Sequence, residues 1–353
     1  MRRILGLVCF VFFVLCLLVG CASSVGVVDD GNCGDGVNGS IGVNGGGPLV
    51  VGIAWRQDVK SPAFMRVVDY FSSAGFEVVL LDKVVSPSLE YYPDGTLSDS
   101  NVNLDFSLTE ECVEVLRTCS VEVPAGVSDV DLIVFTGGED ISPTLYGKPF
   151  DLDSLDFSDM YVYNAERDVS DYLLMRYALD NDIPVLGICR GMQMLAIGSG
   201  YRLIEDIPSY YTSNGVSDAV MHRAVDGGYS FHEVFVESSD NHGLFDSGEA
   251  FIVASSHHQA VDMSSMYLGS GSTSCVSFTA FDRSVGCLDD CLDGCPESVR
   301  VPEVLECTNK SFAVGIQFHP EYYIDHPDVP GYEASVRFLE KLKNSLVCDF
   351  YPF

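Results

Sequence analysis

Positive charge is scarce in this sequence of 353 residues, in which 19 Lys and Arg stand against 51 Asp and Glu. The resulting net charge of −32 repels nucleic-acid phosphates and anionic lipid headgroups, so we expect no nucleic-acid partner. Disordered, collagenous and multi-span membrane proteins are excluded because 47% of the residues are hydrophobic and 20% are charged. No long repeat is visible. The composition is that of a globular protein with a real core.

The first residues have the features of an export signal. Two arginines precede an uncharged apolar run at residues 4–19, which is short for a membrane span of about 20 residues. Leu-Val-Gly-Cys at 18–21 resembles the lipobox of bacterial lipoproteins, whose cysteine receives the lipid. We therefore expect residues 1–20 to be a signal peptide and Cys21 to be lipidated, which places the protein in the bacterial cell envelope, periplasmic or on the surface. An uncleaved anchor is the alternative.

The rest of the chain divides into a linker and one domain. Residues 21–48 are rich in Gly and Asn and have no amphipathic period, which predicts a flexible tether. Residues 49–353 are predicted to form a single hydrolase domain. Insertions are expected near 83–130 and 263–311, where the regular alternation of strands and helices is lost.

The strand pattern predicts an α/β fold. Apolar runs of strand length at 49–54, 76–81, 131–135 and 183–188 alternate with helical patterns at 63–73 and 165–180, and an amphipathic helix at 333–346 closes the chain. Strands that are apolar throughout belong to parallel sheets covered on both faces. We expect a three-layer sandwich of the flavodoxin-like kind, with a mostly parallel central sheet.

Cys189 is the centre of the pentapeptide Gly-Ile-Cys-Arg-Gly at 187–191, between an apolar strand and a helix. A nucleophile in such a strained turn needs small flanking residues, because side chains there would collide with the neighbouring strand and helix. The helix N-terminus favours a thiolate, and the next backbone N–H, that of Arg190, can face an oxyanion. A buried structural cysteine is the alternative that the pentapeptide leaves open.

A second segment, Gln-Phe-His-Pro-Glu at 317–321, ends another apolar strand. Alternate residues of a strand project to one face, so His319 and Glu321 share a side. We expect His319 to act as the base toward Cys189 and Glu321 to orient its imidazole.

Four motifs in order resemble the class I glutamine amidotransferase-like fold and, within it, the C26 peptidase group of gamma-glutamyl-gamma-aminobutyrate hydrolases and gamma-glutamyl hydrolases. They are Thr-Gly-Gly-Glu-Asp-Ile-Ser-Pro at 136–143, the cysteine turn, Ser-Ser-His-His-Gln at 255–259 and His-Pro-Glu at 319–321. The resemblance implies an oxyanion hole made by the backbone N–H groups of Gly138 and Arg190. It also implies substrate contacts from Gln193, Ser255, His257, His258 and Gln259. Asp171 departs from the pattern, which usually has glutamate there.

These features favour a cysteine hydrolase of gamma-glutamyl amide or peptide bonds that needs no cofactor. The excess of acidic residues favours a small substrate over a polyglutamate, and we expect the Arg190 guanidinium to bind its alpha-carboxylate. A glutaminase-type amidotransferase subunit and a non-catalytic surface binding lipoprotein are the alternatives. The oligomeric state does not follow from the sequence.

Two groups of residues raise the question of metal. His257 and His258 are a pair that zinc could use, but no third ligand at metal spacing stands beside them, and we expect no metal. Cys287, Cys291 and Cys295, with Cys275 and Cys307 nearby, fit a disulfide-stapled loop or a zinc knot.

Overall fold

The computed structural model describes residues 47–150, 162–216, 220–266, 276–283 and 299–350. For residues 348–350 it describes the backbone alone. The expected signal peptide, the lipidated Cys21 and all but the last residues of the tether lie outside this part. So do Cys275, Cys287, Cys291 and Cys295. In the part that is described, no helix combines the length and the apolar character needed to cross a bilayer.

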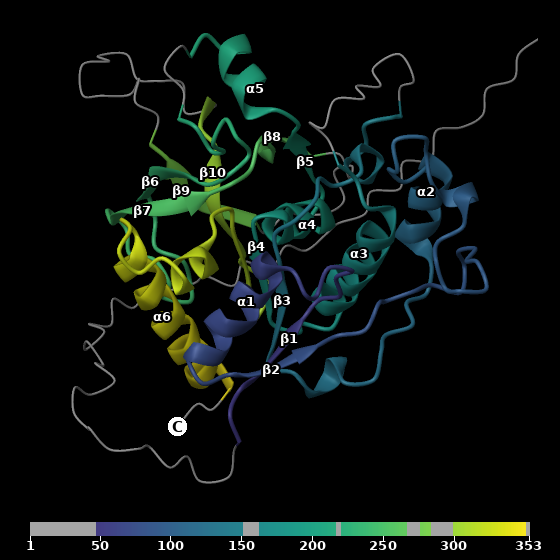
Figure 1. The fold of residues 1–353 in the computed structure, drawn as a ribbon, viewed down its shortest axis with the longest axis horizontal. Coiled ribbons are helices and arrows are strands. Elements are labelled where there is room, and N and C mark those ends of the chain that lie inside the picture. Colours follow the sequence, from purple (N-terminus) through teal and green to yellow (C-terminus); the bar gives the residue numbers. More distant parts are fainter. Residues whose placement is uncertain (1–46, 151–161, 217–219, 267–275, 284–298, 351–353) are drawn as a thin grey trace, which may run out of the picture. The chain divides into compact units, whose positions relative to one another are not determined.

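A nine-stranded sheet in the order β2-β1-β3-β4-β11-β10-β9-β6-β7 forms the centre of the molecule (Figure 1). The first five strands pair in parallel, and the remaining four pairings are antiparallel, so only β10 and β6 run against the common direction. The strands are β1 Val50–Ile53, β2 Glu77–Leu80, β3 Leu132–Phe135, β4 Val185–Ile188, β6 Ser230–Val236, β7 Ala250–Ser255, β9 Val276–Asp282, β10 Pro302–Cys307 and β11 Ala313–Ile316. A two-stranded sheet pairs β5 Tyr201–Ile204 with β8 Ala260–Met266.

Helices cover both faces of the central sheet, which confirms the predicted three-layer α/β sandwich. On β3, Leu132 and Val134 face one apolar layer while Ile133 and Phe135 face the other, because alternate residues of a strand point to opposite faces. Helices α1 and α6 pack on the first layer and α2, α3 and α4 on the second (Figure 1). The helices are α1 Pro62–Ser73, α2 Glu110–Thr118, α3 Ala165–Asp180, α4 Arg190–Gly198, α5 Ile207–Ser213 and α6 Tyr332–Phe350.

Local sequence signals explain where the helices begin. The Ser61 hydroxyl accepts a hydrogen bond from the Phe64 N–H at 3.2 Å, and Pro62 occupies the first turn of α1, where its missing N–H costs nothing. Asn164 caps α3 in the same way, accepting from the Arg167 N–H at 3.2 Å. Capping therefore fixes the start of α3, the helix of the second layer that carries Arg167, Asp168 and Asp171.

The two expected insertions behave differently. Residues 83–130 contribute α2 and no strand of the central sheet, and their apolar side chains join the layer of α3 and α4. Residues 263–311, in contrast, supply β9 and β10, which lie inside the central sheet, so the lost strand-helix alternation there reflects antiparallel strands. Antiparallel neighbours need no crossover helix, and the strand-helix rhythm used for the prediction cannot detect them.

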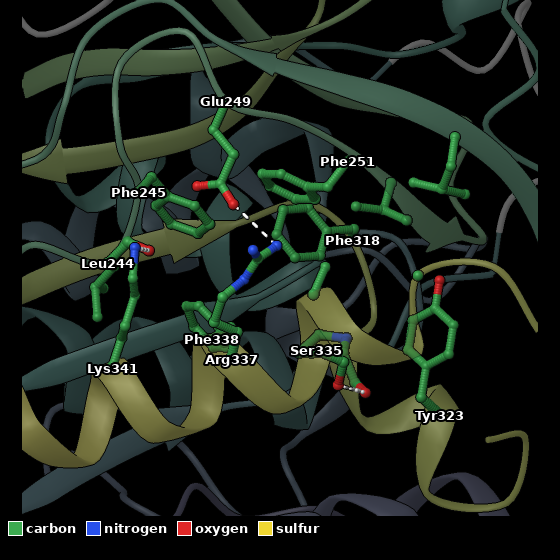
Figure 2. A pocket seen from close by; sticks show the side chains of 15 residues that line it. Leu244, Phe245, Glu249, Phe251, Phe318, Tyr323, Ser335, Arg337, Phe338 and Lys341 are labelled. Carbon is green, nitrogen blue, oxygen red and sulfur yellow. Dashed lines mark hydrogen bonds and ion pairs between the residues drawn. The ribbon is translucent and has the colours of Figure 1, made fainter.

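A small apolar cavity lies between β7 and α6 (Figure 2). It has a volume of about 20 Å³, close to that of a single water molecule, and aromatic rings such as Phe245, Phe251 and Phe338 line it. The ion pair between Arg337 and Glu249, 3.0 Å long, closes one side. The cavity is a packing feature of this layer and is too small for a substrate.

Candidate active site

Three neighbouring strands, β3, β4 and β11, bring the predicted site residues together. Gly137 and Gly138 follow β3, Cys189 follows β4, and His319 follows β11 by three residues. Because these strands are parallel, their carboxyl ends meet at one edge of the sheet, where α/β proteins bind ligands. The topology therefore gathers residues that lie up to 182 positions apart, from 137 to 319, into one site.

Cys189 occupies a strained turn at the start of α4. Its φ of 52° is one of three positive values among the described non-glycine residues, and its ψ is −106°. The two flanking glycines make this turn possible, because a Cβ at Gly187 would overlap the backbone of Gly191 and a Cβ at Gly191 would overlap the carbonyl of Phe135. The Cys189 N–H donates to the Ile316 carbonyl at 2.7 Å, which ties the turn to β11.

His319 and Glu321 form a buried pair beside Cys189. The His319 Nδ1–H donates to Glu321 Oε1 at 2.7 Å, which leaves Nε2 for another partner. Burial alone would lower the pKa of His319, but the charges of Glu321 and Cys189 and a hydrogen bond with Cys189 raise this pKa well above its usual range. Gly137 packs against both residues, since a Cβ there would lie 2.7 Å from His319 Cε1 and 3.4 Å from Cys189 Cβ.

Two buried arginines hold the peptide between Gly137 and Gly138. Arg56 Nη1 donates to the Gly137 carbonyl at 2.7 Å, and Arg167 Nη2 donates to the same oxygen at 3.0 Å. The carbonyl and the N–H of a trans peptide point in opposite directions. The Gly138 N–H therefore points away from both guanidinium groups, and its orientation is fixed before any ligand binds.

A cleft of about 210 Å³ opens at Cys189. This is much more than a single water molecule needs and leaves room for a small ligand. Gln193 closes its floor, where Nε2 donates to the Gln259 carbonyl at 3.1 Å. The lining residues are Gly138, Glu139, Asp140, Val162, Cys189, Arg190, Gln193, Arg223, Ser256, His257, His258 and Gln259.

Comparison with known proteins identifies the family to which the chain belongs. The family model of Peptidase C26 matches residues 118–321, which is more than half of the chain. The chain belongs to the Peptidase C26 family. It has the class I glutamine amidotransferase-like fold, and its function is that of a cysteine hydrolase or an amidotransferase-type enzyme.

Two relatives have names of the amidotransferase kind. A glutamine amidotransferase-like protein of Rickettsia prowazekii is 27% identical over 232 residues, which cover 56% of this chain and 72% of the relative. A protein of Mycobacterium tuberculosis named as a glutamine amidotransferase is 31% identical over 193 residues, 55% of this chain and about half (51%) of its own length. Among solved structures, a glutamine amidotransferase of Thermotoga maritima is 14% identical, with a TM-score of 0.41 over 86% of this chain and 98% of that one.

Two expected substrate contacts of this C26 protein are corrected by the structure. The Arg190 guanidinium is 1% exposed and binds the carboxylates of Asp168 and Asp171 on α3, so it does not face the cleft. Ser255 is fully buried and donates to the His222 carbonyl at 2.8 Å. Ser255 is the last residue of β7, where side chains alternate between faces, and its neighbour Ser256 lines the cleft instead.

The other residues of the Ser-Ser-His-His-Gln motif do line the cleft. The His257 Nδ1–H donates to the Gln259 carbonyl at 2.8 Å, and His258 Nε2–H donates to Asp140 Oδ1 at 3.0 Å. Both polar atoms of the Gln259 side chain are buried without a hydrogen-bond partner among the described residues. They are available to a ligand.

The charges around the cleft were missed from the sequence. Burial would raise the pKa of Glu139, but Arg167, 2.6 Å away, lowers this pKa to about 2, so Glu139 is a carboxylate on the cleft wall. Arg223 also lines the cleft, is exposed, and has no ion-pair partner among the described residues. Arg223 lies in no motif, and Glu139, although it follows Gly138 in the first motif, was given no role. The position of both beside Cys189 depends on the folding of distant loops.

Tyr229 is a further neighbour of the site that no motif indicated. Its ring stands edge-on to His319, with ring centroids 5.2 Å apart and an interplanar angle of 89°. Burial raises the pKa of Tyr229, which is therefore a neutral phenol. Together with Gly137 it restricts the imidazole of His319 to one plane.

Proposed function

We propose that this protein hydrolyses gamma-glutamyl amide or peptide bonds of small compounds. The observation that carries the proposal is the arrangement of Cys189, in its strained turn at the cleft, beside the His319–Glu321 pair. In this proposal the three residues form a catalytic triad, with Cys189 as nucleophile, His319 as acid and base, and Glu321 as the group that orients His319.

The reaction has two halves. The Cys189 thiolate attacks the gamma-carbonyl carbon, and the negative charge that develops on the oxygen is stabilised by the N–H groups of Gly138 and Arg190. Collapse of this intermediate breaks the C–N bond as His319 donates its proton to the leaving amine. His319 then takes a proton from water, which attacks the thioester, and Cys189 leaves as a thiolate to restore the starting state.

The charges of the cleft suit the head of a glutamyl group. A free alpha-carboxylate pairs with the exposed Arg223, and an alpha-ammonium pairs with the carboxylates of Glu139 and Asp140. Among the described residues that line the cleft, Arg223 is the one cation without an ion-pair partner. This favours one carboxylate over several, since each further carboxylate of a polyglutamate would meet an acidic protein surface without a counter-charge. We therefore propose gamma-glutamyl amines or dipeptides as the substrate class.

A competition experiment tests the substrate class. A gamma-glutamyl amine, free glutamine and a gamma-linked polyglutamate are supplied together at low and high salt, and kcat/KM is measured for each. We expect the gamma-glutamyl amine to be preferred, and the change Arg223→Gln to raise its KM about tenfold, with the exposed Arg283→Gln as control. Preference for glutamine would instead favour a glutaminase, in line with the names of the relatives. Preference for the polyglutamate would refute the proposed class, and turnover of none would favour a non-catalytic binding protein.

We also propose that the protein is exported and attached to the bacterial envelope. The proposal is supported by the lipobox-like sequence at Cys21 and by the Gly- and Asn-rich residues that follow, which would let the enzyme domain stand off the membrane. Removal of residues 1–20 deletes two arginines, and the charge of the mature chain becomes 17 minus 51, or −34.

A further inference from the structure

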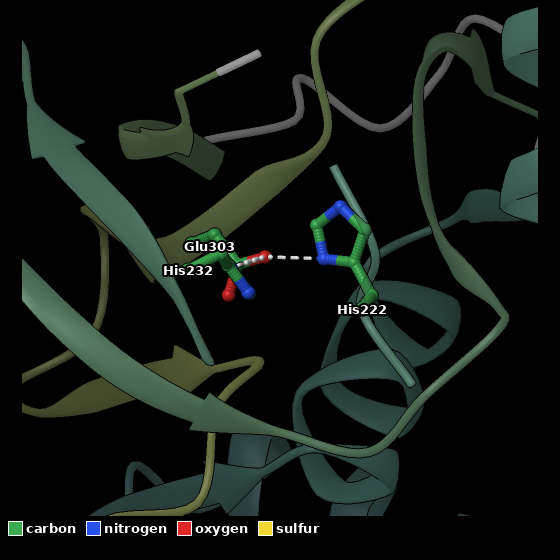
Figure 3. Close-up of side chains that lie close together, drawn as sticks. All are labelled: His222, His232 and Glu303. Atoms are coloured by element: carbon green, nitrogen blue, oxygen red, sulfur yellow. Dashed lines mark hydrogen bonds and ion pairs between the residues drawn. The ribbon is translucent and has the colours of Figure 1, made fainter. Parts of the chain in front are cut away.

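Three histidines surround one buried carboxylate behind the His257 wall of the cleft, and the proposed mechanism uses none of the four groups. His232 lies on β6, Glu303 on β10 and His222 in the segment before β6 (Figure 3). His257 follows β7 by two residues. Glu303 has no exposed surface, and none of the histidines is more than 6% exposed. Burial of an ionised carboxylate is costly unless cations or hydrogen bonds compensate it.

The donor atoms of this cluster converge on one point. Glu303 Oε1 lies 3.2 Å from His222 Nδ1, 3.2 Å from His232 Nε2 and 3.8 Å from His257 Nε2. The ligand atoms of His222, His232 and Glu303 all lie within 4.8 Å of one another. In a tetrahedral zinc site with bonds of about 2.0–2.1 Å, neighbouring ligand atoms are separated by about 3.3–3.4 Å. The distances from Glu303 Oε1 to His222 and His232 are close to this spacing, and the distance to His257 is about 0.4 Å longer.

A single hydrogen bond, between His232 and Glu303, does not account for the convergence of all three rings. The Nδ1 atom of His222, the Nε2 atom of His257 and the second oxygen of Glu303 are buried and make no hydrogen bond within the described part of the chain. His232 Nε2 shares a hydrogen bond with Glu303 Oε1 at 3.2 Å, whereas His222 Nδ1 and His257 Nε2 approach the same oxygen without making one. Buried polar atoms without partners are rare in native proteins, and each calls for an unseen partner.

The surrounding groups orient the rings as the outer shell of a metal site does. The His257 Nδ1–H donates to the Gln259 carbonyl at 2.8 Å, which fixes the tautomer and leaves a lone pair on Nε2. His222 Nε2 lies 3.6 Å from Asp282 Oδ2, and Asp282 in turn accepts a hydrogen bond from the Tyr211 hydroxyl. Metal-bound histidines commonly direct their other nitrogen to a carbonyl or carboxylate in this way.

We propose that His222, His232, His257 and Glu303 bind a divalent transition-metal ion, with Zn²⁺ as the best match. Three imidazoles and one carboxylate are donors that suit zinc, and four of them fill a tetrahedral shell. The charge also balances, because the +2 ion offsets the two buried carboxylates of Glu303 and Asp282. Of the two adjacent histidines, His257 belongs to this site, whereas His258 forms a hydrogen bond with Asp140.

The ion would act as a structural support. It would link β6, β10 and the segment at 255–259, so the cleft wall that carries His257 and Gln259 would be held against the central sheet. Protein side chains would fill all four coordination positions, as they do in structural zinc sites.

Metal content and stability test the site without reference to any substrate. The full-length chain is stripped with a chelator and titrated with Zn²⁺ or Co²⁺ alone, with bound metal measured by elemental mass spectrometry. We expect one equivalent per chain, a rise in Tm of about 5 °C on adding Zn²⁺, and the visible absorption of tetrahedral Co²⁺. His232→Gln and Glu303→Gln should lower zinc affinity at least tenfold, while His326→Gln, outside the cluster, should leave it unchanged.

A cysteine variant separates this site from the possible zinc knot at 275–307. Cys291→Ser should keep the equivalent of zinc, and the Co²⁺ form should lack thiolate-to-metal charge transfer. Loss of zinc in Cys291→Ser with retention in His232→Gln would overturn the proposal. Well under one equivalent in the unmutated chain, with no change of Tm on adding Zn²⁺, would also overturn it and show that the histidines share protons with Glu303 instead. If the cluster variants fail to fold, the titration of the unmutated chain still decides between these outcomes.

Discussion

His319 Nδ1 lies 2.7 Å from Glu321 Oε1, and both side chains are buried next to Cys189. Proline at 320 separates the two residues and begins a short 3₁₀ turn, Pro320–Ile324, which brings the carboxylate back toward the imidazole ring. The pair is therefore formed within one turn of chain and does not depend on distant segments. Its contact with the nucleophile, in contrast, depends on the pairing of β11 with β4.

Replacement of Cys189 should abolish catalysis. Cys189→Ser should lower kcat/KM for a gamma-glutamyl substrate by about 10³ or more, because a serine hydroxyl is a poor nucleophile beside an imidazole arranged for a thiolate. Cys112→Ala is the matched control, since burial raises the pKa of Cys112 to about 12 and makes that thiol unreactive. A cysteine-reactive glutamine analogue should label Cys189 and not Cys112 in peptide mapping. Unchanged turnover in Cys189→Ser would remove the proposed mechanism.

Removal of the Glu321 charge should change the pH dependence. Glu321→Gln takes away one of the charges that raise the pKa of His319, so this pKa falls and the alkaline limb of kcat/KM moves to lower pH. The raised pKa of His319 also makes the stability of the fold depend on pH. A raised pKa stabilises the fold fully below about pH 6.5, the value for unfolded histidine, and this contribution is lost as the pH rises through the folded value. The free energy of unfolding, measured with urea at several values from pH 6 to pH 9, should therefore fall more steeply with pH for the unmutated protein than for Glu321→Gln. Equal slopes would show that Glu321 does not control the imidazole.

Arg56 should affect kcat because it orients the peptide between Gly137 and Gly138. Arg56→Gln removes one of the two donors to the Gly137 carbonyl, so the Gly138 N–H is less well oriented. We expect kcat to fall about tenfold to a hundredfold, since removal of one oxyanion donor costs about 10²–10³. KM should change little because Arg56 does not line the cleft. Arg56→Lys should restore part of the rate, and Arg66→Gln serves as control. A rise in KM with kcat unchanged would contradict a positioning role.

The glycine beyond the nucleophile should not tolerate a side chain. Gly191→Ala places a methyl group onto the Phe135 carbonyl and should destabilise the fold by about 2–3 kcal/mol, measured by urea unfolding. Gly198→Ala, later in α4, is the control: its Cβ would meet the flexible Met175 side chain at 3.3 Å, so the gain of about 1 kcal/mol in helix propensity limits any loss. Similar effects of the two changes would show that the turn at Cys189 is not tightly packed.

Attachment to the membrane should depend on Cys21. Cys21→Ser should move the expressed protein from the detergent phase to the aqueous phase of a detergent partition, or leave an uncleaved precursor visible by mass spectrometry. Changing Cys33, which lies in the expected tether, should have neither effect. If Cys21→Ser changed neither partition nor size, the anchor would be of another kind.

The sequence by itself determined the parts of this protein that depend on short stretches of chain. Unbroken apolar runs identified β1, β3 and β4 because parallel strands are buried on both faces, and the cysteine turn was recognisable because Gly187 and Gly191 are required by local geometry. His319 and Glu321 were predicted to share a side from the alternation of strand residues, but they pair through the 3₁₀ turn that begins at Pro320, beyond the end of β11.

Only the tertiary structure decided which long side chains face the cleft. Arg190 stands next to the nucleophile in sequence, but its guanidinium reaches back to two carboxylates on α3, a pairing that depends on how α3 and α4 pack. Arg223 and Glu139 reach the cleft from loops whose positions carry no periodic signal. The cluster of His222, His232, His257 and Glu303 is assembled from four segments, so no spacing in the chain could predict it. Side chains that meet through sheet pairing between β6, β9 and β10 become neighbours only when the sheet forms.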